Sequence, residues 1–171
     1  MQNFSRRFVH QLLACALGLA TTAWATDQKP PDPINWSLKS DEPSQSMKSG
    51  SVFKVKLEAS IEPGWHLYST EQAQGGPKPT RIVLAPDQVF EAGGAVESPA
   101  PLTAHDDNFD IETEFYEEAV AFTIPVRVSD RATPGLYKLR VEVRFQSCTK
   151  ELCLPPRTVK LELPVEVAKT G

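Results

Sequence analysis

The sequence of 171 residues has few aromatic side chains, few cysteines and no surplus of positive charge. Aromatic residues make up 8% of the chain, and 18 Lys and Arg residues against 22 Asp and Glu leave a formal net charge of -4. A general nucleic-acid-binding protein carries a basic surplus, so this function class is excluded. The chain also lacks a Gly-x-Ser-x-Gly motif and a phosphate-binding loop, so nothing supports a serine hydrolase or a kinase.

Proline, in contrast, is abundant. Fifteen of the 171 residues are proline, well above the ~5% typical of proteins, and they are scattered from Pro30 to Pro164. Because proline breaks helices, this distribution excludes an all-α protein and a fold that alternates strands and helices. The length suits one domain that buries a real core without help from a metal or a disulfide.

The first 25 residues have the features of a secretory signal peptide. Arg6 and Arg7 precede an apolar run from Phe8 to Ala20 that is too short to span a membrane. Ala23-Trp24-Ala25 then supplies the small residues that signal peptidase accepts. We therefore expect cleavage after Ala25 and export to the periplasm.

The N-terminal sequence also has an alternative interpretation. Leu12-Leu13-Ala14-Cys15 also looks like a bacterial lipobox, which would make Cys15 a lipid-carrying N-terminus, although this cysteine lies in the middle of the apolar run. No later apolar stretch approaches 18 residues, so we expect no membrane span in the mature chain.

Most of the remaining chain alternates apolar and polar residues with a period of two. The pattern is clearest at residues 51–59, 120–128, 136–146 and 157–167, and shorter candidates lie at 65–69 and 80–85. This period is typical of half-buried strands, and turn signals such as Thr133-Pro134-Gly135 separate them. We predict six to eight antiparallel strands in an all-β, immunoglobulin-like β-sandwich.

The boundaries of this domain follow from composition. Residues 26–50 are rich in Pro, Ser, Asp and Lys and predict a loose lead-in, with Trp36 docking on the core. We divide the mature chain into a flexible lead-in at 26–34, a domain at 35–167 and a tail at 168–171. Pro125 and Pro164 fall inside strand patterns, which predicts an edge strand or a bulge at each.

Cys148 and Cys153 are the two cysteines of the mature chain, and they lie between two predicted strands. Cysteines five apart cannot bridge two sheets, as the disulfide of antibody domains does. Three interpretations remain. The pair is a structural staple, for which the short loop gives only about 2 kcal/mol; a reversible dithiol, with Lys150 nearby to lower a thiolate pKa; or a metal site with His66 or His105, although the spacing is not that of a zinc knuckle.

Two further segments hold unusual side chains. Residues 106–118 contain seven acids and no base, with Phe109 and Phe115 among them. They form either a solvated loop or a functional loop whose aromatic residues cover something. Residues 62–69 are rich in large rings; they either belong to the core and a turn or line the cysteine rim, with His66 as a proton acceptor.

Together these segments resemble the N-terminal periplasmic domain of DsbD, the DsbD-alpha or disulfide bond corrector family. The resemblance covers about residues 35–167 and rests on three pieces: Gly64-Trp65-His66-Leu67-Tyr68-Ser69, an acidic loop with Phe, and Gln-x-Cys-x4-Cys-Leu-Pro-Pro at 146–156. It implies an immunoglobulin-like domain without a cofactor or metal, acting as a monomer. Its two cysteines would exchange electrons with thioredoxin-like periplasmic proteins or with a separate membrane electron donor.

The resemblance also implies roles for single residues. Cys153 maps onto the cysteine that forms mixed disulfides, and Cys148 maps onto its resolving partner. Within His105-Asp106-Asp107-Asn108-Phe109, Phe109 maps onto the cap that shields the pair and Asp107 onto the proton acceptor, while Asn108 stands where the family's other carboxylate can lie. Phe115 is an alternative cap, and Tyr68 and His66 would lie on the rim.

Two other functions remain as alternatives. The first is a non-catalytic immunoglobulin-like interaction module whose disulfide only holds a loop. The second is a copper- or zinc-handling domain that uses Cys148, Cys153 and His66. DsbD continues into a membrane domain and a thioredoxin domain, whereas this sequence ends at Gly171. On the leading interpretation we therefore expect a separate protein to reduce the pair, or the pair to work in the oxidising direction.

Overall fold

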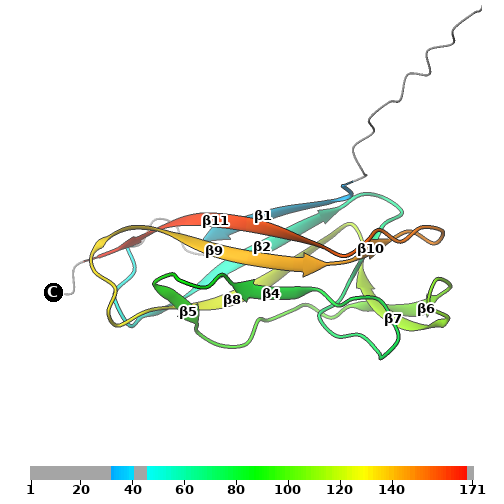
Figure 1. Ribbon diagram of the computed structural model, residues 1–171, viewed down its shortest axis with the longest axis horizontal. Coiled ribbons are helices and arrows are strands. Elements are labelled where there is room, and N and C mark those ends of the chain that lie inside the picture. Colours follow the sequence, from blue (N-terminus) through cyan, green and yellow to red (C-terminus); the bar gives the residue numbers. More distant parts are fainter. Residues whose placement is uncertain (1–31, 41–45, 169–171) are drawn as a thin grey trace, which may run out of the picture. The chain divides into compact units, whose positions relative to one another are not determined.

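The computed structural model describes residues 32–40 and 46–168, and this part of the chain is all-β (Figure 1). The predicted signal peptide, the lipobox cysteine Cys15 and residues 26–31 lie outside these ranges. The described residues contain no helix that is long and apolar enough to cross a membrane. The strands are β1 (Ile34–Ser40), β2 (Val52–Ile61), β3 (His66–Tyr68), β4 (Arg81–Leu84), β5 (Phe90–Ala92), β6 (Leu102–Asp106), β7 (Ile111–Tyr116), β8 (Ala119–Val128), β9 (Gly135–Phe145), β10 (Ser147–Cys148) and β11 (Arg157–Val167).

These strands form three antiparallel sheets. The four-stranded sheet β1-β2-β8-β5 and the three-stranded sheet β11-β9-β4 are the two layers of the sandwich, and β10-β3-β7-β6 forms a further four-stranded sheet. In Figure 1, β9 and β11 lie along one layer, and β6, β7 and β10 lie toward one end of it. The predicted immunoglobulin-like β-sandwich is confirmed.

The period of two places one face of each long strand in the core. On β8, Val120, Phe122, Ile124, Val126 and Val128 are all buried, and Leu139, Val141, Val143 and Phe145 of β9 are fully buried. Burying one such side chain contributes about 1.5–3 kcal/mol. These residues form one continuous core with those of β2 and β1, so the two main layers are held together without the cysteines.

The prediction that residues 26–50 form a loose lead-in is wrong for residues 34–40. Residues 34–40 form β1, which pairs along its whole length with β2 from Ile34↔Ile61 to Ser40↔Val55. Trp36 docks on the core as predicted, with its ring 5.3 Å from the ring of Phe145. The alternation of Ile34, Trp36 and Leu38 with polar residues is a strand signal that the surrounding Pro, Ser and Asp residues conceal. The eleven strands of the described chain also exceed the six to eight predicted.

The two strand prolines behave differently. Pro164 lies on β11, an edge strand of the three-stranded sheet, as predicted. Pro125 lies on β8, which has neighbours on both sides, so the edge-strand prediction is wrong there. The Pro125 carbonyl accepts a hydrogen bond from the Gly93 amide, one residue past the end of β5. At this pair Pro125 supplies only the carbonyl acceptor and no N–H, so the proline lies where the pairing of β8 with β5 ends.

The acidic segment is mostly a hairpin and not a loop. β6 and β7 pair from Leu102↔Phe115 to Asp106↔Ile111, and only residues 107–110 form the turn between them. Thr113 and Phe115 are buried, whereas Glu112 is exposed and Glu114 is half-buried. Through β3, this hairpin is placed in the same sheet as β10, the strand that carries Cys148.

Candidate functional site

The two cysteines close a tight turn at the end of β10. Their Sγ atoms are bonded at 2.01 Å, and Cys148 and Cys153 form an isolated antiparallel bridge. The Thr149 amide donates to the Leu152 carbonyl at 2.8 Å, and the Thr149 hydroxyl accepts from the amides of Glu151 and Leu152. The spacer of four residues between the cysteines is therefore held in place by these hydrogen bonds as well as by the disulfide.

The two cysteines differ in their exposure to solvent. Cys148 is fully buried, whereas Cys153 is half-buried and is preceded by the exposed Leu152. In thiol–disulfide exchange the attacking thiolate must reach one sulfur, and the other sulfur leaves. This arrangement favours attack on Cys153 and departure of Cys148.

Aromatic side chains surround the disulfide and form a cluster separate from the main core. Tyr68, Phe115 and Cys148 are its buried members, with Phe109 and Cys153 against them. Tyr68 on β3 pairs in register with Phe115 on β7, and the rings of Tyr68 and Phe109 meet edge to face at 6.1 Å. Phe115 thus belongs to a strand beneath the disulfide, and Phe109 belongs to the β6–β7 turn.

A buried carboxylate that the sequence prediction missed lies under this cluster. The Tyr68 hydroxyl donates to Asp106 Oδ2 at 2.5 Å, and the backbone N–H of Asn108 donates to Asp106 Oδ1 at 2.9 Å. Burial raises the pKa of Tyr68, and the hydrogen bond to Asp106 raises it further. Tyr68 is therefore a neutral donor.

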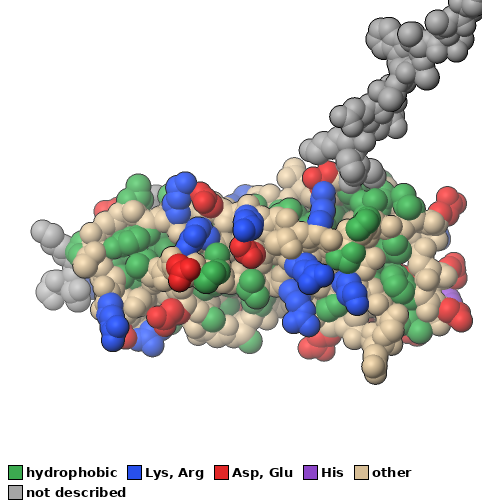
Figure 2. All heavy atoms as spheres, in the orientation of Figure 1, with side chains coloured by type: hydrophobic (Ala, Val, Ile, Leu, Met, Phe, Trp, Pro, Cys, Tyr) green, Lys and Arg blue, Asp and Glu red, His purple; other side chains and the backbone are tan. Residues whose placement is uncertain are grey.

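Asp107, the carboxylate expected to accept a proton, lies one residue further along and faces outward. Its side chain is 80% exposed, and its Oδ1 is 3.9 Å from His105 Nε2. Asp110 in the same turn is also exposed and lies 3.4 Å from His105 Nε2. Figure 2 shows acidic side chains and a histidine gathered at the end of the domain that carries this turn.

His66 joins the cysteine strand to a second carboxylate. It pairs in register with Cys148 between β3 and β10, and its ring stacks on Phe115 with centroids 4.1 Å apart. Its Nε2 lies 2.9 Å from Glu117 Oε1, a partner that the sequence prediction did not include. His66 thus lies on the strand beside Cys148.

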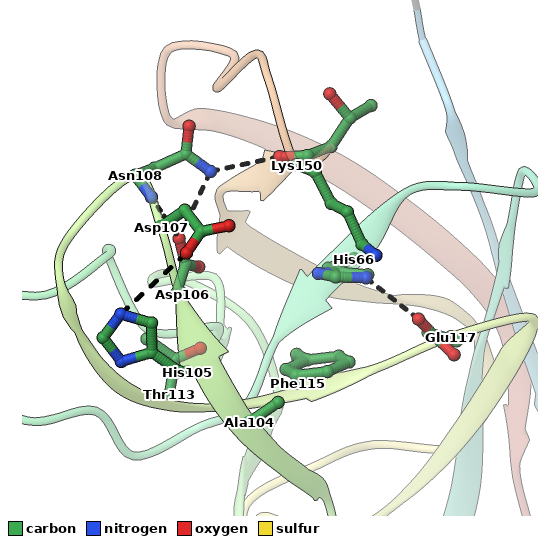
Figure 3. A pocket seen from close by; sticks show the side chains of 11 residues that line it. His66, Ala104, His105, Asp106, Asp107, Asn108, Thr113, Phe115, Glu117 and Lys150 are labelled. Carbon is green, nitrogen blue, oxygen red and sulfur yellow. Dashed lines mark hydrogen bonds and ion pairs between the residues drawn. The ribbon is translucent and has the colours of Figure 1, made fainter.

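A cavity of about 260 Å³ opens between the 106–108 segment, the spacer and β7. Figure 3 shows Lys150 pointing down toward His66 on one side, and Asp107 with His105 on the other. Phe115 lies below, and the buried hydroxyl of Thr113, which has no hydrogen-bond partner in the described chain, is part of the wall. The cavity therefore presents groups of both charges beside the disulfide.

The predicted metal alternative gains no support from this geometry. Within residues 32–40 and 46–168, no group of three or more His, Cys, Asp or Glu side chains is arranged to hold a metal ion. His66 contacts Glu117 and Phe115, and both cysteine sulfurs are bonded to each other.

The fold and the site define an immunoglobulin-like domain with a disulfide set in an aromatic cluster at one end. The family model described as thiol:disulfide interchange protein DsbD, N-terminal, matches residues 38–164. The match covers well over half of the chain, and the protein belongs to this family. Family membership and the bonded cysteine pair indicate a role in thiol–disulfide interchange.

Two solved structures are similar to this chain, and the one with a TM-score above 0.5 supports the fold. The reduced DsbD N-terminal domain of Neisseria meningitidis is 14% identical, with a TM-score of 0.46, over 70% of this chain and 83% of that one. The N-terminal periplasmic domain of ScsB from Proteus mirabilis is 19% identical, with a TM-score of 0.56, over 80% of this chain and 48% of that one. This protein thus spans about half of the ScsB chain. No curated protein matches the sequence.

Proposed function

We propose that the protein is a periplasmic thiol–disulfide exchange protein that passes electrons between a reductant and thioredoxin-like partners through a reversible Cys148–Cys153 pair. The observation that carries this proposal is the half-buried Cys153 bonded to a fully buried Cys148. The periplasmic location rests on the expected signal peptide at 1–25 and on the domain at 35–167.

In the reducing direction, the Cys153 thiolate attacks the disulfide of the partner and releases one partner cysteine as a thiolate. The Cys148 thiol then loses its proton and attacks Cys153 Sγ, which forms the Cys148–Cys153 bond and breaks the mixed disulfide. The partner leaves with two thiols, and two electrons and two protons have moved to it. Reduction of this protein by a donor dithiol follows the same steps in reverse.

The surrounding residues would serve this exchange as follows. Phe109 is proposed as the cap, because it lies in a turn and packs against the cluster that contains Tyr68 and Cys148. Asp107 is proposed as the proton acceptor on the exposed side of the cavity, with His66 as the group on its opposite wall. The hydrogen bond from Tyr68 to Asp106 would keep the floor of the site rigid.

A trapping experiment tests the proposal. Cys148→Ser leaves Cys153 as a free thiol that can form a mixed disulfide but cannot resolve it. We expect this variant to react readily with a thioredoxin-fold protein whose single active-site cysteine is activated with thionitrobenzoate, and the released coloured thiolate gives the rate. Cys153→Ser is the matched control and should react much more slowly, since Cys148 is buried.

If both variants are equally inert, the disulfide is a structural staple and the proposal is wrong. Equal reactivity of the two would contradict the assignment of Cys153 as the attacking cysteine.

A further inference from the structure

We infer that Asn108 is a positioning residue for the exchange reaction, because its amide ties the turn that carries Phe109 to the spacer between the two cysteines. This inference rests on the proposed function and adds to it a control over access to the disulfide. The Asn108 Nδ2 group donates to the Thr149 carbonyl at 3.1 Å and to Asp106 Oδ1 at 3.2 Å. Figure 3 shows the first contact as the dashed line from Asn108 toward the segment that carries Lys150.

The contact with Thr149 completes a chain of hydrogen bonds around the disulfide. The Tyr68 hydroxyl donates to Asp106, Asp106 accepts from Asn108, and Asn108 donates to the residue next to Cys148. Within the described chain, Asn108 donates a side-chain hydrogen bond that joins the 107–110 turn to the cysteine spacer. If this bond breaks, the turn keeps the packing of Phe109 against Tyr68 but loses its hydrogen bond to the spacer.

The position requires an amide. Both partners of the Asn108 side chain, a carbonyl oxygen and a carboxylate oxygen, are acceptors, so only a donor satisfies them. An ionised Asp would donate to neither and would repel Asp106. The side chain is exposed, so water competes for the same groups and the tie is weak enough to open. A weak tie suits a cover that must admit a partner and exclude other thiols.

The test compares the rates at which dithiothreitol reduces the oxidised protein and three variants. We expect Asn108→Ala to be reduced about three times faster than the wild type, because it loses the hydrogen bonds to Thr149 and Asp106. We expect Asn108→Asp to be reduced about ten times faster, because it also adds repulsion with Asp106. Asp110→Asn is the matched control: it lies in the same turn, is 97% exposed and has no bond to the spacer. Asn tolerates the backbone φ of 56° at position 110, so the reduction rate of Asp110→Asn should stay at the wild-type value.

A second readout separates opening of the turn from general loosening. Amide hydrogen exchange at Asn108 and Phe109, whose N–H groups bond to Asp106, should speed up in both Asn108 variants, with the urea midpoint nearly unchanged. Unchanged rates in the Asn108 variants, or an equal rise in Asp110→Asn, would overturn the inference. A reduction potential outside the range of exchange proteins would contradict the proposed function but not the role of Asn108. That role is decided separately, by the order of the reduction rates of the wild type and the three variants.

Discussion

At the scale of single residues, Tyr68 is the side chain whose chemistry the site constrains most. It is fully buried and donates to Asp106, and its pKa is raised above the ordinary value of 10.0. Ionisation is therefore easier in the unfolded chain than in the folded protein. The resulting contribution to stability is complete below pH 10 and is lost as the pH rises above that value.

We therefore expect the wild type to lose more stability than Tyr68→Phe between pH 10 and 11.5. The difference should grow by up to about 1.4 kcal/mol per pH unit, the value for one proton. Urea unfolding at several pH values measures it, and other groups cancel in the comparison. At pH 7 the variant should be less stable by about 1–3 kcal/mol, because Asp106 loses a buried donor. Parallel pH profiles of the two proteins would contradict this account of Tyr68.

Phe109 and Phe115 are predicted to respond differently to truncation. Phe115→Ala removes a buried strand residue and should cost about 3–5 kcal/mol of unfolding free energy. Phe109→Ala should cost about 1 kcal/mol, the value of one aromatic pair, and should speed reduction by dithiothreitol several-fold. Urea unfolding and reduction rates of both variants decide which residue is the cap. A faster reaction in a stable Phe115→Ala protein would assign the cap to Phe115 instead.

Much of the site could be predicted at this scale, because His66, Tyr68, Phe109, Cys148 and Cys153 lie together as expected. The burial of Asp106 beside Tyr68 could not be predicted. Asp106 ends β6 and faces inward, whereas Asp107 begins the turn and faces water. Neighbouring residues at the end of a strand point in opposite directions, so which of the two carboxylates is buried depends on where the strand ends.

At the scale of elements, the prediction succeeded where strands are long. The segments that became β2, β8, β9 and β11 each show the period of two over nine or more residues. β7 was missed because its charge suggests a solvated loop, although Ile111, Thr113 and Phe115 alternate with acids. β6 was missed because four of its five residues are exposed and show no apolar alternation. β10 has two residues, and no periodicity can reveal a strand that short.

We expect the fold to form without the disulfide that closes the turn after β10. It closes a loop of six residues, whose constraint on the unfolded chain contributes about 2 kcal/mol. Reduction, or the Cys148→Ser/Cys153→Ser double variant, should lower the unfolding free energy by about that amount and leave a cooperative transition. Urea unfolding with and without reductant checks this. Unfolding on reduction would identify the bond as a structural staple.

At the scale of the whole domain, the main core and the cluster around the disulfide are separate. The main core joins the sheets β1-β2-β8-β5 and β11-β9-β4, and the disulfide belongs to a second cluster with Tyr68 and Phe115. A change at the sulfurs is therefore expected to leave the sandwich intact, and the proposed exchange reaction needs this, because in it the protein stays folded with the cysteine pair oxidised or reduced. This separation depends on contacts between distant strands, so composition alone could not show it.

The most direct test of the account is the reduction potential of the Cys148–Cys153 couple, measured by equilibration against glutathione or dithiothreitol buffers. The account predicts a value between about -120 and -270 mV, the range of proteins that exchange disulfides. A value below about -300 mV, typical of inert structural disulfides, would contradict it.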